Sequence, residues 1–284
     1  MKPDGSDVER LAALVRRHDR ERFLTALFAP AERRSALFAL FAFNYEIAKT
    51  REIVSEPTLG RIRLQWWREG IETAYGGGTV RTHEVLTPLA AAIRAHGLSR
   101  REFDRMIDAR ERDLEPEPPA TLAELEFYGE STAGALQSLV LDALGERGEP
   151  ALTATRAAGT AYALMGLIRA IPFHARAGRQ YIPRELAEGE RLDLRDFFEL
   201  RPSPELAKIA ERLAASVATH LARARAHRSD VPRAAMPALL PARLAAGHLR
   251  RLRRAHFNVF DPRLAQPSPG AALSLALAIL TRRY

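Results

Sequence analysis

Apolar residues recur at helical spacing along almost the whole chain of 284 residues. Leu59, Ile62 and Trp66 follow one another three or four positions apart, as residues do on a helix with one buried side. No alternation of apolar and polar residues is long enough to predict a strand. The hydrophobic content of 46% suffices for one large core, and no linker-like stretch divides it. The sequence therefore predicts an all-α chain with a single domain over residues 1–284.

Glycine and proline mark where helices are expected to stop. Gly76-Gly77-Gly78 closes one helix, and Pro116-Glu117-Pro118-Pro119 predicts a loop. Pro172 lacks a backbone donor and is expected to kink or end the helix that contains it. Pro183 is expected to close that same helix.

The charge balance is strongly basic, and the bases are almost all arginines. The net charge is +8, while the lysines are Lys2, Lys49 and Lys208 alone. This preference is typical of a GC-rich bacterial genome; the alternative is attraction to an anionic membrane or an acidic partner. The chain has no cysteine, which excludes disulfides and thiolate metal sites. No nucleic-acid-binding motif accompanies the charge, so no nucleic-acid partner is expected.

Membrane association is expected to be peripheral at most. The apolar run 271–280 is too short to span a bilayer as a helix. The stretch 249–254 combines four arginines with two leucines, and such a basic helical side can rest on anionic lipid. We expect a cytoplasmic protein, either soluble or bound to the inner face of the cytoplasmic membrane.

Several segments, taken in their order and spacing, resemble squalene and phytoene synthases, which join two prenyl diphosphates head to head. They are 33–43, 64–69, 107–113 with Tyr128, and 178–183. The resemblance covers most of the chain and implies an isoprenoid-synthase-type helical bundle with a central cavity. In the enzymes of this family, each of two helices offers Asp residues four positions apart, hence on one side. These acids hold magnesium, which makes the diphosphate a leaving group.

The chain departs from this family at the metal-binding positions. The four positions are Ala48, Glu52, Ala170 and His174. Only Glu52 keeps a carboxylate, which is equally explained as a solvated or paired acid, and neutral imidazole is a poor magnesium ligand. No metal site and no catalytic residue is expected. Magnesium is a cofactor only under the alternative of an active head-to-head prenyltransferase with atypical metal binding.

The same departures resemble a non-catalytic branch of the family that includes a mitochondrial complex I assembly factor. Segments 54–60, 169–174 and 256–262 carry this second resemblance. It implies a pseudoenzyme whose partners are respiratory complex I subunits or assembly intermediates, an anionic lipid surface, or both. A lipid or prenyl carrier that uses the inherited cavity without chemistry is a further alternative.

Basic residues near the lost metal positions are candidates for a metal-free anion site. They are Lys49, Arg51, Arg169, His174, Arg176 and Arg179. Arginine forks bind phosphate directly; the alternative is a solvated or salt-bridged surface.

Two further groups of side chains have structural and functional explanations. Phe41, Phe43, Trp66 and Trp67 line a prenyl channel or form plain core. Asp108, Glu111 and Asp113 alternate with arginines, which favours a salt-bridged helix side over a metal site.

Overall fold

The computed structural model describes residues 5–266 and 270–284, and within these ranges it contains helices and no strand. The prediction of an all-α chain is confirmed. In chain order the elements are α1 (Gly5–His18), α2 (Arg20–Ala26), α3 (Ala31–Ala48), α4 (Thr50–Ile53), α5 (Pro57–Tyr75), α6 (Leu86–His96), α7 (Arg100–Glu111), η1 (Arg112–Leu114), α8 (Leu122–Gly129), η2 (Glu130–Gly134), α9 (Ala135–Leu144), α10 (Glu149–Arg176), α11 (Arg184–Gly189), α12 (Leu194–Phe198), α13 (Pro204–Ala226), η3 (Arg233–Ala235), α14 (Met236–Arg254), α15 (Pro262–Ala265) and α16 (Ala271–Thr281).

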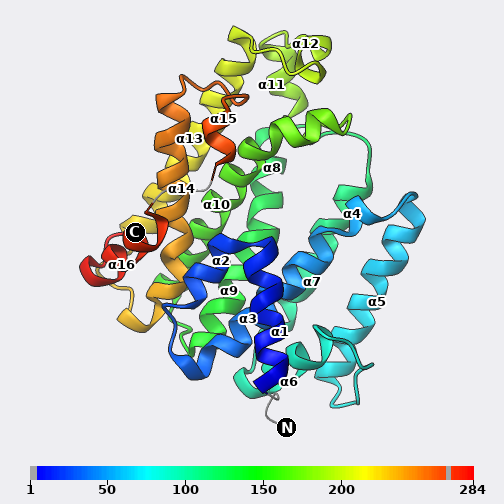
Figure 1. The fold of residues 1–284 in the computed structure, drawn as a ribbon, viewed down its shortest axis with the longest axis vertical. Coiled ribbons are helices and arrows are strands. Elements are labelled where there is room, and N and C mark those ends of the chain that lie inside the picture. Colours follow the sequence, from blue (N-terminus) through cyan, green and yellow to red (C-terminus); the bar gives the residue numbers. More distant parts are fainter. Residues whose placement is uncertain (1–4, 267–269) are drawn as a thin grey trace.

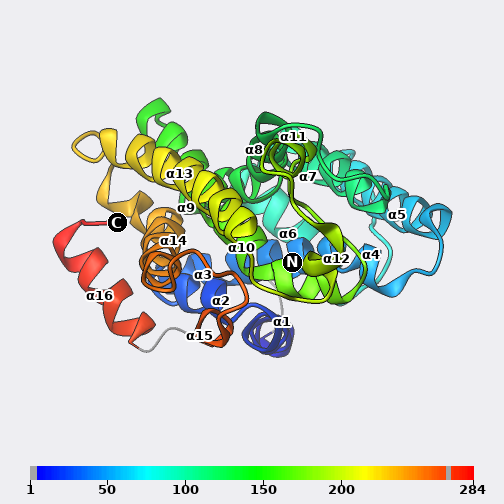
Figure 2. The ribbon, with the colours of Figure 1, turned by 90° about the horizontal axis from the view of Figure 1, so that it is seen from above.

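The 28-residue helix α10 is the central element of the fold. It packs against α13, α14, η2, α9 and α8. Helices α5 and α7 lie at the opposite edge of the molecule from α14 and α16 (Figure 1). The view from above places α10 between the α13 side and the α7–α8 side (Figure 2). Residues from many parts of the chain therefore meet along α10.

The middle of α3 is buried because its sequence is apolar on every side there. Every residue from Ala36 to Phe43 is buried, as expected for a helix that is hydrophobic all round. Phe43 contacts Trp67 and Phe103 edge-on, with ring centroids 5.3 Å apart in each pair. Phe41, Phe43 and Trp67 are at most 2% exposed. These aromatic residues form plain core, and Trp66 is partly buried against it.

A close backbone contact fixes α10 against η2, which is a π-helical turn. A Cβ atom added to Gly159 of α10 would lie 2.4 Å from the carbonyl oxygen of Ala133. It would also lie 2.9 Å from the Cα of Gly134. Only glycine at position 159 permits this approach of one backbone to another.

Pro172 does not end α10, and Pro183 lies beyond the end of this helix. The helix continues through Pro172 and ends at Arg176, followed by Gly178 with a φ of +66°. Pro172 removes one backbone donor, and the turn that follows it is nevertheless helical. Pro183 does not close α10; it precedes α11 as its N-cap residue.

Candidate functional site

The ends of α3 and α4 carry the first pair of degenerate metal positions. Ala48 is the last residue of α3, and the exposed Glu52 lies on the short helix α4. The buried acid of this region is Glu46, which is 3% exposed. Its Oε1 lies 2.5 Å from Lys49 Nζ, and its Oε2 lies 2.6 Å from Arg63 Nη2. Both carboxylate oxygens of Glu46 are thus engaged by cations, and Lys49 is held in an ion pair.

The second pair of positions, Ala170 and His174, lies on the last two turns of α10. The His174 ring packs on Tyr181, with a centroid separation of 4.5 Å. Its Nδ1 atom is buried and has no hydrogen-bond partner among the described residues. Burial, followed by the nearby charge of Arg179, lowers the pKa of His174 to about 4, although Asp113 opposes the shift. At neutral pH, His174 is therefore an uncharged imidazole with an unused ring nitrogen.

Asp113 organises a buried polar cluster beside His174. Asp113 is 7% exposed and accepts hydrogen bonds from the hydroxyls of Tyr128 at 2.8 Å and Tyr181 at 3.2 Å. Arg110 Nη1 donates to Asp113 Oδ2 at 3.1 Å and to the Tyr128 hydroxyl oxygen at 2.5 Å. Burial raises the pKa of Tyr128 well above its usual value, and the Asp113 charge adds to this. Both tyrosines remain neutral donors.

A pocket of about 40 Å³ adjoins this cluster. Arg179, Gln180 and Tyr181 line it together with Asp113 and Tyr128. Gln180 Oε1 is buried without a hydrogen-bond partner among the described residues. A site of this size holds about one water molecule, so it fits a small polar group rather than a diphosphate.

A second polar cluster binds Arg169. The Glu21 carboxylate of α2 accepts from the Tyr162 hydroxyl at 2.9 Å, and its Oε1 lies 2.7 Å from His248 Nε2. Arg169 Nη1 lies 3.1 Å from the same His248 nitrogen and 3.7 Å from Glu21 Oε2. Burial alone would raise the pKa of Glu21, but the bond and charge of His248 and the charge of Arg169 lower it to about 2. Arg169 thus ties α2, α10 and α14 together.

The candidate anion ligands are therefore divided among different surroundings. Lys49 pairs with Glu46, Arg169 with Glu21, and Arg179 lies beside His174. Arg51 is partly buried on α4, whereas Arg176 is exposed at the end of α10. The structure brings His174 and Arg179 together from this set. Asp113, Tyr128 and Tyr181 join them, and no local pattern in the sequence indicates this grouping.

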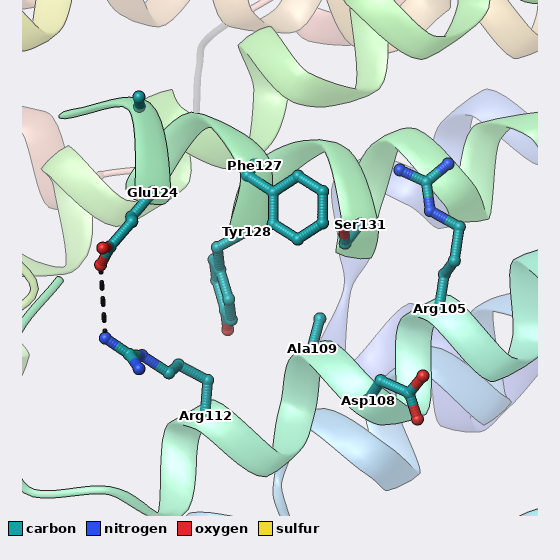
Figure 3. Close-up of a pocket in the computed structure, with 9 residues that line it drawn as sticks. Arg105, Asp108, Ala109, Arg112, Glu124, Phe127, Tyr128 and Ser131 are labelled. Carbon is teal, nitrogen blue, oxygen red and sulfur yellow. Dashed lines mark hydrogen bonds and ion pairs between the residues drawn. The ribbon is translucent and has the colours of Figure 1, made fainter. Parts of the chain in front are cut away.

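A groove of about 570 Å³ runs between α7 and α8 (Figure 3). Phe127, Tyr128 and Ala109 supply its apolar surface, and Arg112 bonds Glu124 across one end. Ser131 is 3% exposed, and its hydroxyl oxygen has no partner among the described residues.

Asp108 and Glu111 of α7 form ion pairs, but their partner is Arg68 of α5 rather than an arginine of the same helix. Arg68 donates to Asp108 Oδ1 at 2.8 Å and to Glu111 Oε1 at 2.9 Å. Asp113 forms an ion pair with Arg110, three residues before it. Asp113 is buried, whereas Asp108 and Glu111 are exposed.

Within 5–266 and 270–284, no group of three or more His, Asp or Glu side chains is placed to hold a metal ion. In the same ranges, no helix combines the length and apolar character needed to cross a bilayer.

The profile of the squalene/phytoene synthase family matches residues 15–270. NADH dehydrogenase (ubiquinone) complex I, assembly factor 6, of Mus musculus is 31% identical over 272 residues, covering 95% of this chain and 81% of the relative. The protein of the same name from Homo sapiens is 30% identical over equal shares. A presqualene diphosphate synthase of Sinorhizobium fredii is 26% identical over 195 residues, 68% of each chain.

Solved structures share the fold. A squalene synthase of Alicyclobacillus acidocaldarius superposes with a TM-score of 0.78 at 22% identity, over 89% of this chain and 95% of that one. A dehydrosqualene synthase in complex with ligand gives a TM-score of 0.84 at 17% identity, over 98% and 96%. The prediction of an isoprenoid-synthase-type bundle is confirmed.

Proposed function

Because the chain belongs to the squalene/phytoene synthase family, we propose that it is a non-catalytic member that serves the assembly of respiratory complex I. Relatives at 30–31% identity that cover 95% of this chain bear the name of a complex I assembly factor. They support a binding role whose partners are complex I subunits or assembly intermediates. Its place of action, on this proposal, is the cytoplasmic side of a membrane, where it binds peripherally.

The observation that carries the proposal is the set of side chains that could bind magnesium at the ends of α3 and α10. Magnesium requires oxygen ligands, including one or two carboxylates. Here alanines occupy positions 48 and 170, the imidazole of His174 occupies another, and the exposed Glu52 is the one carboxylate at these four positions. The buried Glu46 is bound by Lys49 and Arg63. These residues do not fit a magnesium-diphosphate complex, so we derive no prenyl-transfer step through it.

Deletion of the gene in the source organism tests the assembly role. We expect less fully assembled complex I in native gels and lower NADH-oxidising activity of the membranes. Re-expression of the intact chain should restore both. Normal amounts of assembled, active complex I in the deletion strain would overturn the proposal.

Calorimetric titration of the purified chain tests catalysis directly. Farnesyl and geranylgeranyl diphosphate are titrated with and without magnesium, and the same samples are assayed for product. We expect no magnesium-dependent binding and no product. Magnesium-dependent binding with turnover would overturn the non-catalytic assignment and establish the prenyltransferase alternative.

The same titration examines the metal-free anion site. If diphosphate binds without magnesium, the double substitution R176Q/R179Q should abolish that binding, because both arginines lie at the end of α10 or directly after it. Arg195→Gln is the matched control, since Arg195 is a mainly exposed arginine on α12 that pairs with Glu199. Binding that survives in R176Q/R179Q would exclude these two residues as the ligands.

A further inference from the structure

Helix α16 carries an exposed stripe of leucines. Leu273, Leu277 and Leu280 are 65%, 47% and 71% exposed. Spacings of four and three residues place the three side chains on one side of the helix. The sequence from Ala271 to Thr281 contains no charged residue. The leucine stripe therefore gives α16 an aliphatic outer surface over about two turns.

The opposite side of α16 is fixed to the protein. Leu275 and Ala278 are buried in a cluster with Leu240 and Leu244 of α14. In both views α16 lies at the outer edge of the molecule, beside α14 (Figures 1 and 2). This packing holds the leucine stripe in place, so the stripe is a permanent outer surface.

Arginines gather at the C-terminal end of this helix. Arg228 donates to the main-chain oxygen of Thr281 at 3.2 Å, and Arg225 donates to that of Tyr284 at 2.7 Å. Arg282 donates to the carbonyl of Val231 at 2.6 Å.

The charge at this end is concentrated. Burial, and then the charges of Arg243 and Arg250, lower the pKa of Arg225. Arg283 is exposed at the same end. Asp230 lies beside Val231 on the loop that Arg282 contacts, and its single charge does not balance these arginines. An anionic surface would relieve the repulsion among them.

We propose that α16 is a membrane-docking helix that lies in the interface of an anionic bilayer. The leucines enter the boundary between headgroups and acyl chains, and the arginines bind the lipid phosphates. The stripe is purely aliphatic, whereas the energetic centres of protein interfaces are enriched in aromatic residues. The observations therefore favour lipid over a protein partner. This inference rests on the membrane part of the proposed function and names the surface responsible.

Vesicle flotation of the full purified chain tests the inference. The vesicles contain phosphatidylcholine alone or phosphatidylcholine mixed with phosphatidylglycerol. We expect flotation with the anionic vesicles, weakened by salt. The substitution L273S/L277S/L280S should reduce the bound fraction about tenfold or more, because it removes the apolar area that enters the interface. The substitution R282Q/R283Q should weaken binding less and reduce its salt dependence.

The matched control is I53S/I62S, which alters two isoleucines that are 54% and 62% exposed on α4 and α5. It should float like the unaltered chain. Equal flotation of the leucine variant and the unaltered chain would overturn the assignment to α16 while leaving membrane binding intact. An unaltered chain that floats with neither vesicle would overturn both the inference and the membrane part of the proposed function. The assembly role is tested independently, by the amount of complex I in the deletion strain, so failure of membrane binding can be distinguished from failure of the assembly role.

Discussion

The two polar clusters on α10 differ in how completely their members are paired. In the Glu21 cluster, His248 is 2% exposed and lies within 3.1 Å of both Glu21 and Arg169. In the Asp113 cluster, His174 is more exposed, and its Nδ1 has no partner within the described residues. Burial without a partner lowers the pKa of His174.

The fully paired Glu21 cluster has a structural role, whereas the Asp113 cluster has polar atoms that are available to bind a small ligand. The Glu21 cluster joins three helices, and each charge in it has an opposite charge or a hydrogen bond. The Asp113 cluster retains unused atoms on His174, Gln180 and Arg110. Buried atoms without partners carry a free-energy penalty that a small polar ligand or water would relieve.

The largest expected effect comes from Glu21→Ala. Removal of this carboxylate leaves Arg169 without its counter-charge and His248 Nε2 without its 2.7 Å hydrogen-bond partner, which should reduce the free energy of unfolding by about 3–5 kcal/mol. Denaturant unfolding followed by circular dichroism measures the change. Glu52→Ala on α4 serves as control and should change stability by less than about 0.5 kcal/mol, since Glu52 is exposed. A stability loss no greater than that of the control would refute the structural role of the cluster.

The two histidines allow a direct comparison. His248→Leu breaks the bond to Glu21 and should destabilise the fold by about 2 kcal/mol. His174→Leu removes a ring whose Nδ1 is unsatisfied, so its effect should be close to zero or slightly stabilising. Thermal unfolding of both variants provides the measurement. Equal losses for the two would show that His174 has a partner as important as that of His248.

A smaller effect is expected in the pH dependence of stability. His174 has a pKa of about 4 in the folded chain, against 6.5 ordinarily. The unfolded chain therefore binds more protons between these values, and stability declines as pH falls from 6.5 toward 4. His174→Gln should flatten part of this decline.

Glu21 affects the stability of the fold at lower pH than His174 does. Its pKa is lowered from 4.5 to about 2, so its contribution is complete above pH 4.5 and is lost as pH falls toward 2. His174→Gln should leave the loss of stability between pH 4.5 and about 2 unchanged. Urea midpoints measured across this range would separate the two windows, and identical profiles for variant and unaltered chain would contradict the assignment to His174.

The helices could be predicted from the sequence because their signals are local. Periodicity and glycine stops predict the helical content, and Gly76 ends α5 as expected. The departure at Ala48, Ala170 and His174 is equally visible in the sequence. The sequence left open whether Pro172 kinks or ends its helix, and the structure shows that the helix continues beyond Pro172 to Arg176.

The clusters could not be predicted because their members are remote in the chain. Glu21 and His248 are separated by 227 positions, and Tyr181 and Asp113 by 68. Asp113 resembles its exposed neighbours Asp108 and Glu111 in sequence, yet it lies on η1 and is buried there. Only the packing of α8 and the segment before α11 shows that it differs from them.

The contact between Gly159 and the backbone of η2 sets the rotation of α10 about its own axis. Tyr162 and Arg169, which serve one cluster, and His174, which serves the other, all follow Gly159 on this helix. One inserted residue after Gly159 would turn all three by about 100°. A change in α10 at this contact would therefore displace members of both clusters together.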